Sequence, residues 1–292
     1  MAKKNKMFKQ IFFIKFPIVF PIIYGTFLFL FPQFEMELIL ITLLVLAETH
    51  FGATWPFFLA KSNIEKIKKD KIKLIFYPLS IVLFSLLGFF FFKSMFLMIF
   101  FMANVYHVTR QSFGVCKLFC KNDLEIKFQE FFIYFFNFIF FIVAFFRFYY
   151  PLINDGNIFL INITILILFL ISCIIYIFKF GLSQNFLTFL TGVIIFYPTC
   201  FVTNPVHAII MGVTMHYTQY IYLTYNVCNM RNKDDINIKN KNNFFSGRIK
   251  NYLFIIILYS VFMSLLSLFG KYENSFMKNL IIIPIIGQML HF

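Results

Sequence analysis

The stretch that decides the fold is NIFLINITILILFLISCIIYIFKF, residues 157–180, which contains a single charged side chain, Lys179, close to its end. A helix needs about 20 apolar residues to cross the hydrocarbon core of a bilayer, and this stretch is long enough. Similar stretches recur along the whole chain. We predict nine full spans and a partial tenth, at residues 11–32, 36–60, 72–92, 94–119, 129–150, 157–180, 184–203, 205–226, 251–270 and 277–292. The predicted fold is an all-α, polytopic transmembrane helix bundle in which residues 1–292 form one integral membrane domain.

The composition supports this class. Of the 292 residues, 61% are hydrophobic and 13% charged, whereas soluble domains are roughly 45–50% apolar and about 25% charged. This composition excludes a soluble enzyme, a disordered protein and a nucleic-acid-binding module. The net charge of +14 comes from short basic runs between apolar stretches, a pattern typical of contact with anionic lipid. We therefore expect the lipid bilayer, and no nucleic acid, as a partner.

The distribution of basic residues predicts the orientation. If the N-terminus is cytoplasmic, the inside segments hold 20 Lys and Arg and the outside segments hold four. This asymmetry follows the positive-inside rule and indicates a multi-pass protein of the bacterial inner membrane. Residues 229–250, rich in Asn and Lys, are expected to form a cytoplasmic loop. The partial span at 277–292 ends without a polar cap, which is typical of a fragment.

All five histidines lie in predicted spans, where ionisable groups are costly and mark functional sites. With a rise of about 1.5 Å per residue, His50, His107, His216 and His291 lie roughly 17–21 Å from the outer ends of their helices. His207 lies only about 3 Å from the outer end of its helix. Four imidazoles in one layer predict a shared metal site, from which His207 points away.

Each histidine of this layer has a polar neighbour about one helical turn away that can hydrogen-bond to its ring. The pairs are Thr54 with His50, Gln111 with His107, Gln219 with His216 and Gln288 with His291. Metal-bound imidazoles need such a partner for the nitrogen that does not bind the metal. We therefore expect Gln111 and Gln219 to support the cofactor. A proton or solute pathway, and purely structural hydrogen bonding, are the two alternative interpretations.

The donor set also predicts the metal. Neutral imidazole suits Fe, Zn and Cu, and the chain lacks the HExxH motif of zinc proteases. A site made of imidazoles inside a bilayer favours a non-haem Fe(II) centre that acts with O₂ on a lipid-soluble substrate. The predicted activity is that of an oxygenase or related oxidoreductase, and the predicted substrate is an isoprenoid or an acyl lipid.

Glu48 and Arg110 are the deepest acid and base of the predicted spans. A buried ion pair between two helices and a catalytic or substrate-binding role are both open for them. Because Glu48 is two residues from His50, it lies on a different helix face and is not expected to bind the same metal. A transporter or channel that uses these residues as a proton or solute relay is the alternative function. Such a protein typically shows an inverted repeat, which we do not find.

Isolated histidines on several helices, and the string His50-Phe51-Gly52-Ala53, resemble the Brp/Blh-type membrane carotene dioxygenases. This resemblance implies a helical membrane oxygenase that binds iron through such histidines. The Asp that follows the family's His-Gly-Ala motif is absent here, as are its paired C-terminal histidines. The strings HxxRQ at His107 and HYxQY at His216 are also similar to uncharacterised polytopic bacterial membrane proteins.

Overall fold

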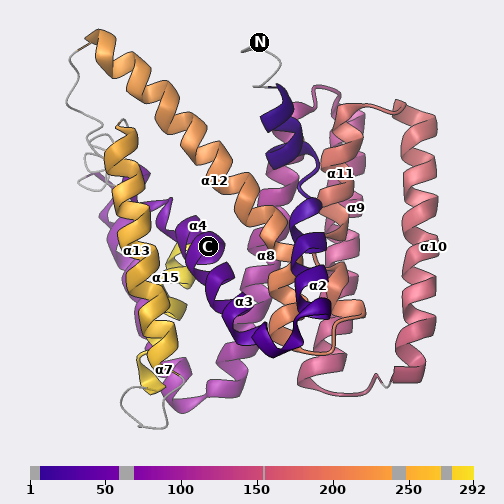
Figure 1. Ribbon diagram of the computed structural model, residues 1–292, viewed down its shortest axis with the longest axis horizontal. Helices are drawn as coiled ribbons and strands as arrows, with labels where there is room; N and C mark the ends of the chain where they lie inside the picture. Colours follow the sequence, from indigo (N-terminus) through magenta and orange to yellow (C-terminus); the bar gives the residue numbers. More distant parts are fainter. Residues whose placement is uncertain (1–6, 59–68, 154, 239–247, 271–277) are drawn as a thin grey trace. The chain divides into compact units, whose positions relative to one another are not determined.

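The computed structural model describes residues 7–58, 69–153, 155–238, 248–270 and 278–292 (Figure 1). Every regular element among these residues is a helix, as the apolar stretches predict. The chain forms two compact units. Unit 1 comprises residues 1–39 and 104–219, and unit 2 comprises residues 40–103 and 220–292. Helices α3, α8 and α12 contain the boundaries, so each of them contributes residues to both units.

Unit 1 is a set of long helices joined by short irregular segments. Its elements are η1 (Ile11–Lys15), α2 (Val19–Leu30), η2 (Pro32–Phe34), the start of α3 (Glu35–Thr42), most of α8 (Lys93–Phe119), α9 (Asp123–Ala144), η5 (Phe145–Tyr149), α10 (Asp155–Phe180), α11 (Gln184–Ile194), η6 (Tyr197–Cys200) and the first part of α12 (Pro205–Ile238). Helix α11 packs against α9 and against η1.

Unit 2 contains shorter helices around α13. Its elements are the end of α3, η3 (Leu43–Ala47), α4 (Glu48–Gly52), α5 (Trp55–Phe58), η4 (Ile72–Phe76), α7 (Tyr77–Phe91), the start of α8, the last part of α12, α13 (Ile249–Phe269) and α15 (Ile282–His291). Helix α4 packs against α13, and α15 packs against α7, α13 and α4. These contacts bring the sequence around His50 next to the sequence around His291.

Five helical segments are long and apolar enough to cross a membrane: Pro32–Phe58, Ile72–Phe91, Asp123–Tyr149, Gly156–Phe180 and Ile249–Phe269. Met7–Lys15 and Val19–Leu30 add a sixth if the pair, which is bent by 61°, is one span. Several helices are therefore suited to a membrane, and the segment 157–180 is among them. The count of nine full spans and the cytoplasmic N-terminus stay predictions.

The structure interrupts some of the predicted spans. Predicted span 184–203 consists of the 11-residue helix α11, a turn and η6, because Pro198 and the residues around it do not continue the helix. The predicted partial span at 277–292 contains α15, which is 10 residues long. The predicted loop 229–250 begins as helix, since α12 continues to Ile238, and residues 239–247 lie outside the described part of the chain.

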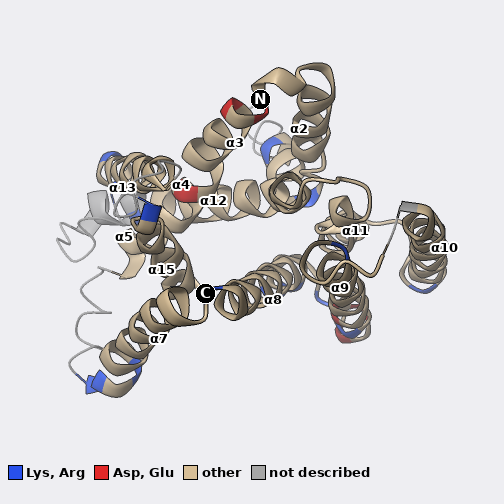
Figure 2. Ribbon diagram, turned by 90° about the horizontal axis from the view of Figure 1, so that it is seen from below, with Lys and Arg blue, Asp and Glu red and all other residues tan. Residues whose placement is uncertain are grey.

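Close helix contacts in unit 1 depend on glycines. A Cβ atom on Gly212 in α12 would lie 1.8 Å from the carbonyl oxygen of Ile195, and one on Gly192 in α11 would lie 2.8 Å from Cδ1 of Ile133. The missing side chains therefore leave room for a backbone carbonyl beside Gly212 and for a side chain beside Gly192, and small residues of this kind are common between helices in membranes. Figure 2 shows that charged residues occupy short stretches and that most of each helix is uncharged.

Candidate metal centre

Two of the four predicted metal ligands lie together in unit 2. His50 in α4 is completely buried, and its ring centroid is 4.6 Å from that of His291 at the end of α15. One ring nitrogen of each residue lies within 4.8 Å of the other. The two imidazoles belong to helices that pack directly against each other (Figure 1). They are the core of the candidate centre.

Thr54 fixes the orientation of His291. Its hydroxyl is 2.8 Å from Nδ1 of His291 and 2.9 Å from the hydroxyl of Tyr220 in α12. Because Nδ1 is engaged in this hydrogen bond, Nε2 is the nitrogen through which His291 would bind a metal. Thr54, which the sequence pairs with His50, thus hydrogen-bonds to His291 instead. The ring of Tyr220 also packs edge-on against His50, with centroids 4.5 Å apart.

A second polar contact joins the same two helices. Nε2 of Gln288 in α15 donates a hydrogen bond to Oε1 of Glu48 in α4 at 3.4 Å. Glu48 is 1% exposed, and its Oε2 has no hydrogen-bond partner among the described residues. Gln288 was predicted to support His291, but in the structure it contacts Glu48. Glu48 therefore lies beside the histidine pair and carries an oxygen that is available to a ligand.

Tyr259 in α13 forms a wall of this site. A Cβ atom on Gly52 would lie 3.0 Å from Cδ1 of Tyr259, and one on Gly287 would lie 2.7 Å from its hydroxyl. The tyrosine therefore occupies the space left by one glycine of α4 and one of α15. Nothing in the sequence distinguishes Tyr259 from the other 14 tyrosines, because its role depends on the packing of three helices.

The other two predicted ligands lie together in unit 1. His107 in α8 and His216 in α12 are 7% and 1% exposed, and their ring centroids are 6.1 Å apart. The planes of the two rings are nearly perpendicular, at 89°. The structure therefore forms one histidine pair within each unit. A single centre with four imidazoles stays a prediction.

The two glutamines predicted to support the cofactor have other surroundings. Nε2 of Gln219 donates to the carbonyl oxygen of Ile14 at 2.8 Å, so it does not serve His216. This carbonyl is at the end of η1, where the chain leaves the helix and the group has no helical donor. Oε1 of Gln111 has no hydrogen-bond partner among the described residues.

Arg110 does not lie in the interior of unit 1. Its side chain is exposed on α8, three residues after His107. A long side chain can extend from a helix in this way while its charge stays in a polar environment. Within unit 2, the described partner of Glu48 is the neutral Gln288. The predicted contact between Glu48 and Arg110 stays a prediction.

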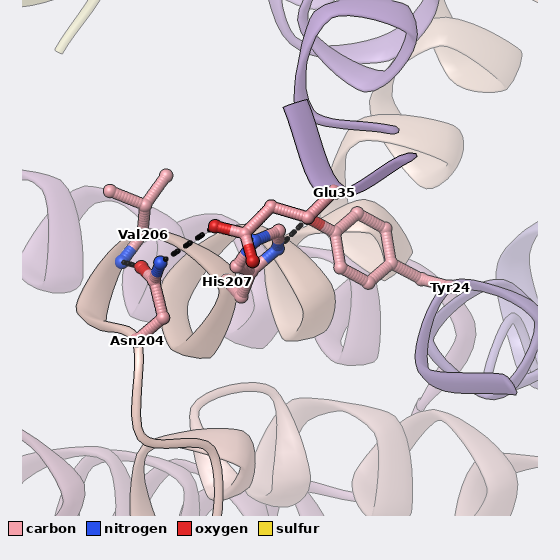
Figure 3. A network of polar contacts seen from close by, with 5 residues as sticks. All are labelled: Tyr24, Glu35, Asn204, Val206 and His207. Atoms are coloured by element: carbon pink, nitrogen blue, oxygen red, sulfur yellow. Dashed lines mark hydrogen bonds and ion pairs between the residues drawn. The ribbon is translucent and has the colours of Figure 1, made fainter. Parts of the chain in front are cut away.

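His207 faces away from the helix surface of His216, and it has partners of its own in unit 1. Figure 3 shows it between the Tyr24 hydroxyl and the Glu35 carboxylate. The position of His207 near the outer end of its predicted helix does not by itself indicate these partners. Glu35 lies between the predicted spans 11–32 and 36–60, at the outer end of both. His207 is also near the outer end of its span, so the sequence places Glu35 and His207 at the same depth.

Comparison of the chain with protein-family models, with curated proteins and with solved structures finds no match. Buried imidazoles on adjacent helices, one of them oriented by a hydroxyl group, are suited to binding a transition metal.

Proposed function

We propose that the protein is an integral membrane metalloprotein of the bacterial inner membrane, with nine full spans, a partial tenth and a cytoplasmic N-terminus. Its centre is proposed to hold non-haem Fe(II) and to act as an oxygenase or oxidoreductase on an isoprenoid or acyl lipid. The observation that carries this proposal is the buried pair of His50 and His291, with Thr54 on one ring.

The residues present fit a metal. Two nitrogens that bind one ion at about 2.1 Å cannot be more than about 4.2 Å apart. The ring nitrogens of His50 and His291 lie within 4.8 Å of each other, so a small side-chain rotation suffices. The proposed ligand set also includes His107 and His216, which the sequence places at the same depth. Bound iron would supply the activation of O₂.

The surrounding residues have separate roles in this proposal. Thr54 holds the His291 ring so that Nε2 remains the binding nitrogen. Glu48 accepts a hydrogen bond from Gln288, and its second oxygen can accept a hydrogen bond from a hydroxyl group of a substrate. Tyr259 closes the space between the glycines of α4 and α15. The apolar helices give a lipid-soluble substrate access from the bilayer.

Metal analysis of the purified full chain tests the proposal. Cells grown with iron should yield wild-type protein that contains bound iron, measured by inductively coupled plasma mass spectrometry. The variants His50→Gln and His291→Gln should lose most of this iron, because each removes one imidazole while it keeps a side chain of similar size. Circular dichroism and gel filtration verify that each variant is folded.

His207→Gln is the matched control, since it removes a buried imidazole that belongs to a different network. It should retain the iron content of the wild type. A folded wild-type protein without metal would contradict the proposal and would favour the transporter or channel alternative. Equal loss of iron in all three variants would show that the histidine pair is not the binding site.

A further inference from the structure

A network of buried polar groups in unit 1 takes no part in the proposed metal centre. The Tyr24 hydroxyl in α2 lies 2.6 Å from Nδ1 of His207, in the first turn of α12. Nε2 of the same ring lies 3.5 Å from Oε1 of Glu35, the first residue of α3. Tyr24 and His207 are 4% and 1% exposed, whereas the Glu35 side chain is 42% exposed. One imidazole therefore connects a buried phenol with a carboxylate that water can reach.

Asn204 holds the carboxylate and the helix end together. Its Oδ1 accepts a hydrogen bond from the backbone N–H of Val206 at 2.9 Å and caps α12, and its Nδ2 donates to Oε1 of Glu35 at 3.3 Å (Figure 3). Glu35 thus lies near the N-terminus of α12 and begins α3. Helix N-termini attract negatively charged groups, and the Glu35 side chain lies close to two of them.

The ionised carboxylate determines which protons His207 carries. If the neutral ring carries its proton at Nε2, this nitrogen faces Glu35 at 3.5 Å without a hydrogen bond among the described residues, and Nδ1 accepts the hydrogen bond of the Tyr24 hydroxyl. When the ring binds a second proton, this proton occupies Nδ1, and the N–H at Nδ1 donates to the Tyr24 oxygen. Tyr24 then changes from donor to acceptor, and the contact with Glu35 becomes an ion pair. One proton is bound, and no other bond is made or broken.

We propose that His207, with Glu35 and Tyr24, is a proton-binding site whose occupation tightens the contact of α2 and α3 with α12. Histidine is the side chain that changes charge near neutral pH. When the ring is protonated, His207 and the Glu35 carboxylate form an attractive charge pair. When the ring is neutral, His207 carries no charge that attracts Glu35. The ion pair therefore exists only while the ring carries both protons.

The other charged groups near this end of unit 1 do not take the place of Glu35. Glu37 is two residues further along α3, turned by about 200° from Glu35, and it is exposed. Arg147 is held by the carbonyl oxygens of Thr199 and Val202, at 2.7 and 2.8 Å. Among the described residues, Tyr24 and Glu35 are the titratable partners of His207.

Hydrogen exchange of the full chain in lipid nanodiscs tests the proposal. Mass spectrometry should follow peptides from residues 19–42 and 203–212 at about pH 8 and about pH 5.5, on either side of the usual imidazole titration. After correction for the intrinsic exchange rate, the protection of both regions should rise about two- to fivefold at the lower pH, as expected for a partly exposed charge pair. His207→Gln should abolish this rise.

Glu35→Gln and Glu37→Gln form the matched comparison, because both remove a carboxylate from α3 and only the first removes the partner of His207. Glu35→Gln should lose the gain in protection, and Glu37→Gln should retain it. This comparison decides the question even if His207→Gln does not fold, since both glutamates have side chains that reach solvent. A wild-type protein without the gain, or a gain retained in Glu35→Gln, would overturn the proposal.

Discussion

At the scale of single residues, buried polar side chains join helices that are distant in sequence. Thr54 connects His291 with Tyr220, Gln219 holds the carbonyl of Ile14, and Tyr24 reaches His207, which is 183 residues away. Such groups are costly inside an apolar bundle unless they are hydrogen-bonded. Each of these contacts therefore specifies which helices pack together, in addition to any chemistry that it supports.

The hydroxyl of Thr54 should determine how tightly the centre binds metal. Thr54→Val keeps the shape of the side chain but removes the hydrogen bond to Nδ1 of His291. Loss of such a supporting contact typically lowers metal affinity about 10- to 100-fold. Competition with a chelator measures the change. Thr49→Val is the control, because the Thr49 hydroxyl donates to carbonyl oxygens of its own helix; equal affinity of the two variants would contradict the role of Thr54.

The thiol of Cys120, at the end of α8, should be unreactive at neutral pH. Burial raises the pKa of this thiol to about 11, and its Sγ–H donates to the carbonyl oxygen of Asn122 at 3.6 Å. The thiolate is the reactive form, so alkylation by a maleimide at pH 7 should be about 300-fold slower than for an ordinary cysteine with a pKa of about 8.5. Mass spectrometry of the folded chain, with the unfolded chain as reference, measures the rate.

At the scale of helices, the apolar stretches predict where helices occur, and the prolines within them mark where they break. Pro17 lies at the 61° bend between Lys15 and Val19, so a kink is expected in 11–32, although its angle is not. In the same way, Pro198 marks the half of 184–203 that leaves the helix. Breaks depend on which carbonyl groups find partners on other helices, as Ile14 does with Gln219. The depth of each histidine along its helix likewise predicts a histidine layer. Which rings pair depends on how each helix is rotated about its axis, and the positions of the histidines in the sequence do not determine this rotation.

Close packing of α12 should be sensitive to one methyl group. Gly212→Ala places a Cβ atom 1.8 Å from the Ile195 carbonyl oxygen, and a backbone atom cannot rotate away as a side chain can. We expect a loss of about 3 kcal/mol or more in the free energy of unfolding, near the upper end of overpacking effects. A shift of the SDS-unfolding midpoint measures this loss.

Gly114→Ala in α8 is the matched control, because a Cβ atom there meets nothing within 4 Å. It should stabilise the helix by about 0.5–1 kcal/mol, since alanine loses less backbone entropy than glycine. If the two substitutions have the same effect, the close approach of Gly212 to Ile195 does not exist in the folded protein.

At the scale of the whole molecule, the basic residues and the breaks in the helices make opposing predictions about the path of the chain. The basic runs at 61–73 and 231–250 place both segments on the cytoplasmic side. Residues 61–68 and 239–247 lie outside the described part of the chain, so these runs are known from the sequence. The short helix α11, followed by η6, raises the alternative that 184–203 does not cross the bilayer.

Reporter fusions distinguish the two paths. If 184–203 crosses, fusions at residues 66 and 240 should be active only with a cytoplasmic reporter, and a fusion at residue 204 only with a periplasmic one. If α11 and η6 re-enter on the side from which they came, residue 204 is cytoplasmic, and α12 then carries residue 240 to the periplasm. The 20 to 4 excess of basic residues on the predicted inside favours the first result, because α12 would otherwise export six basic residues. A periplasmic signal at residue 240 would therefore refute the predicted topology, while the all-helical fold would stand.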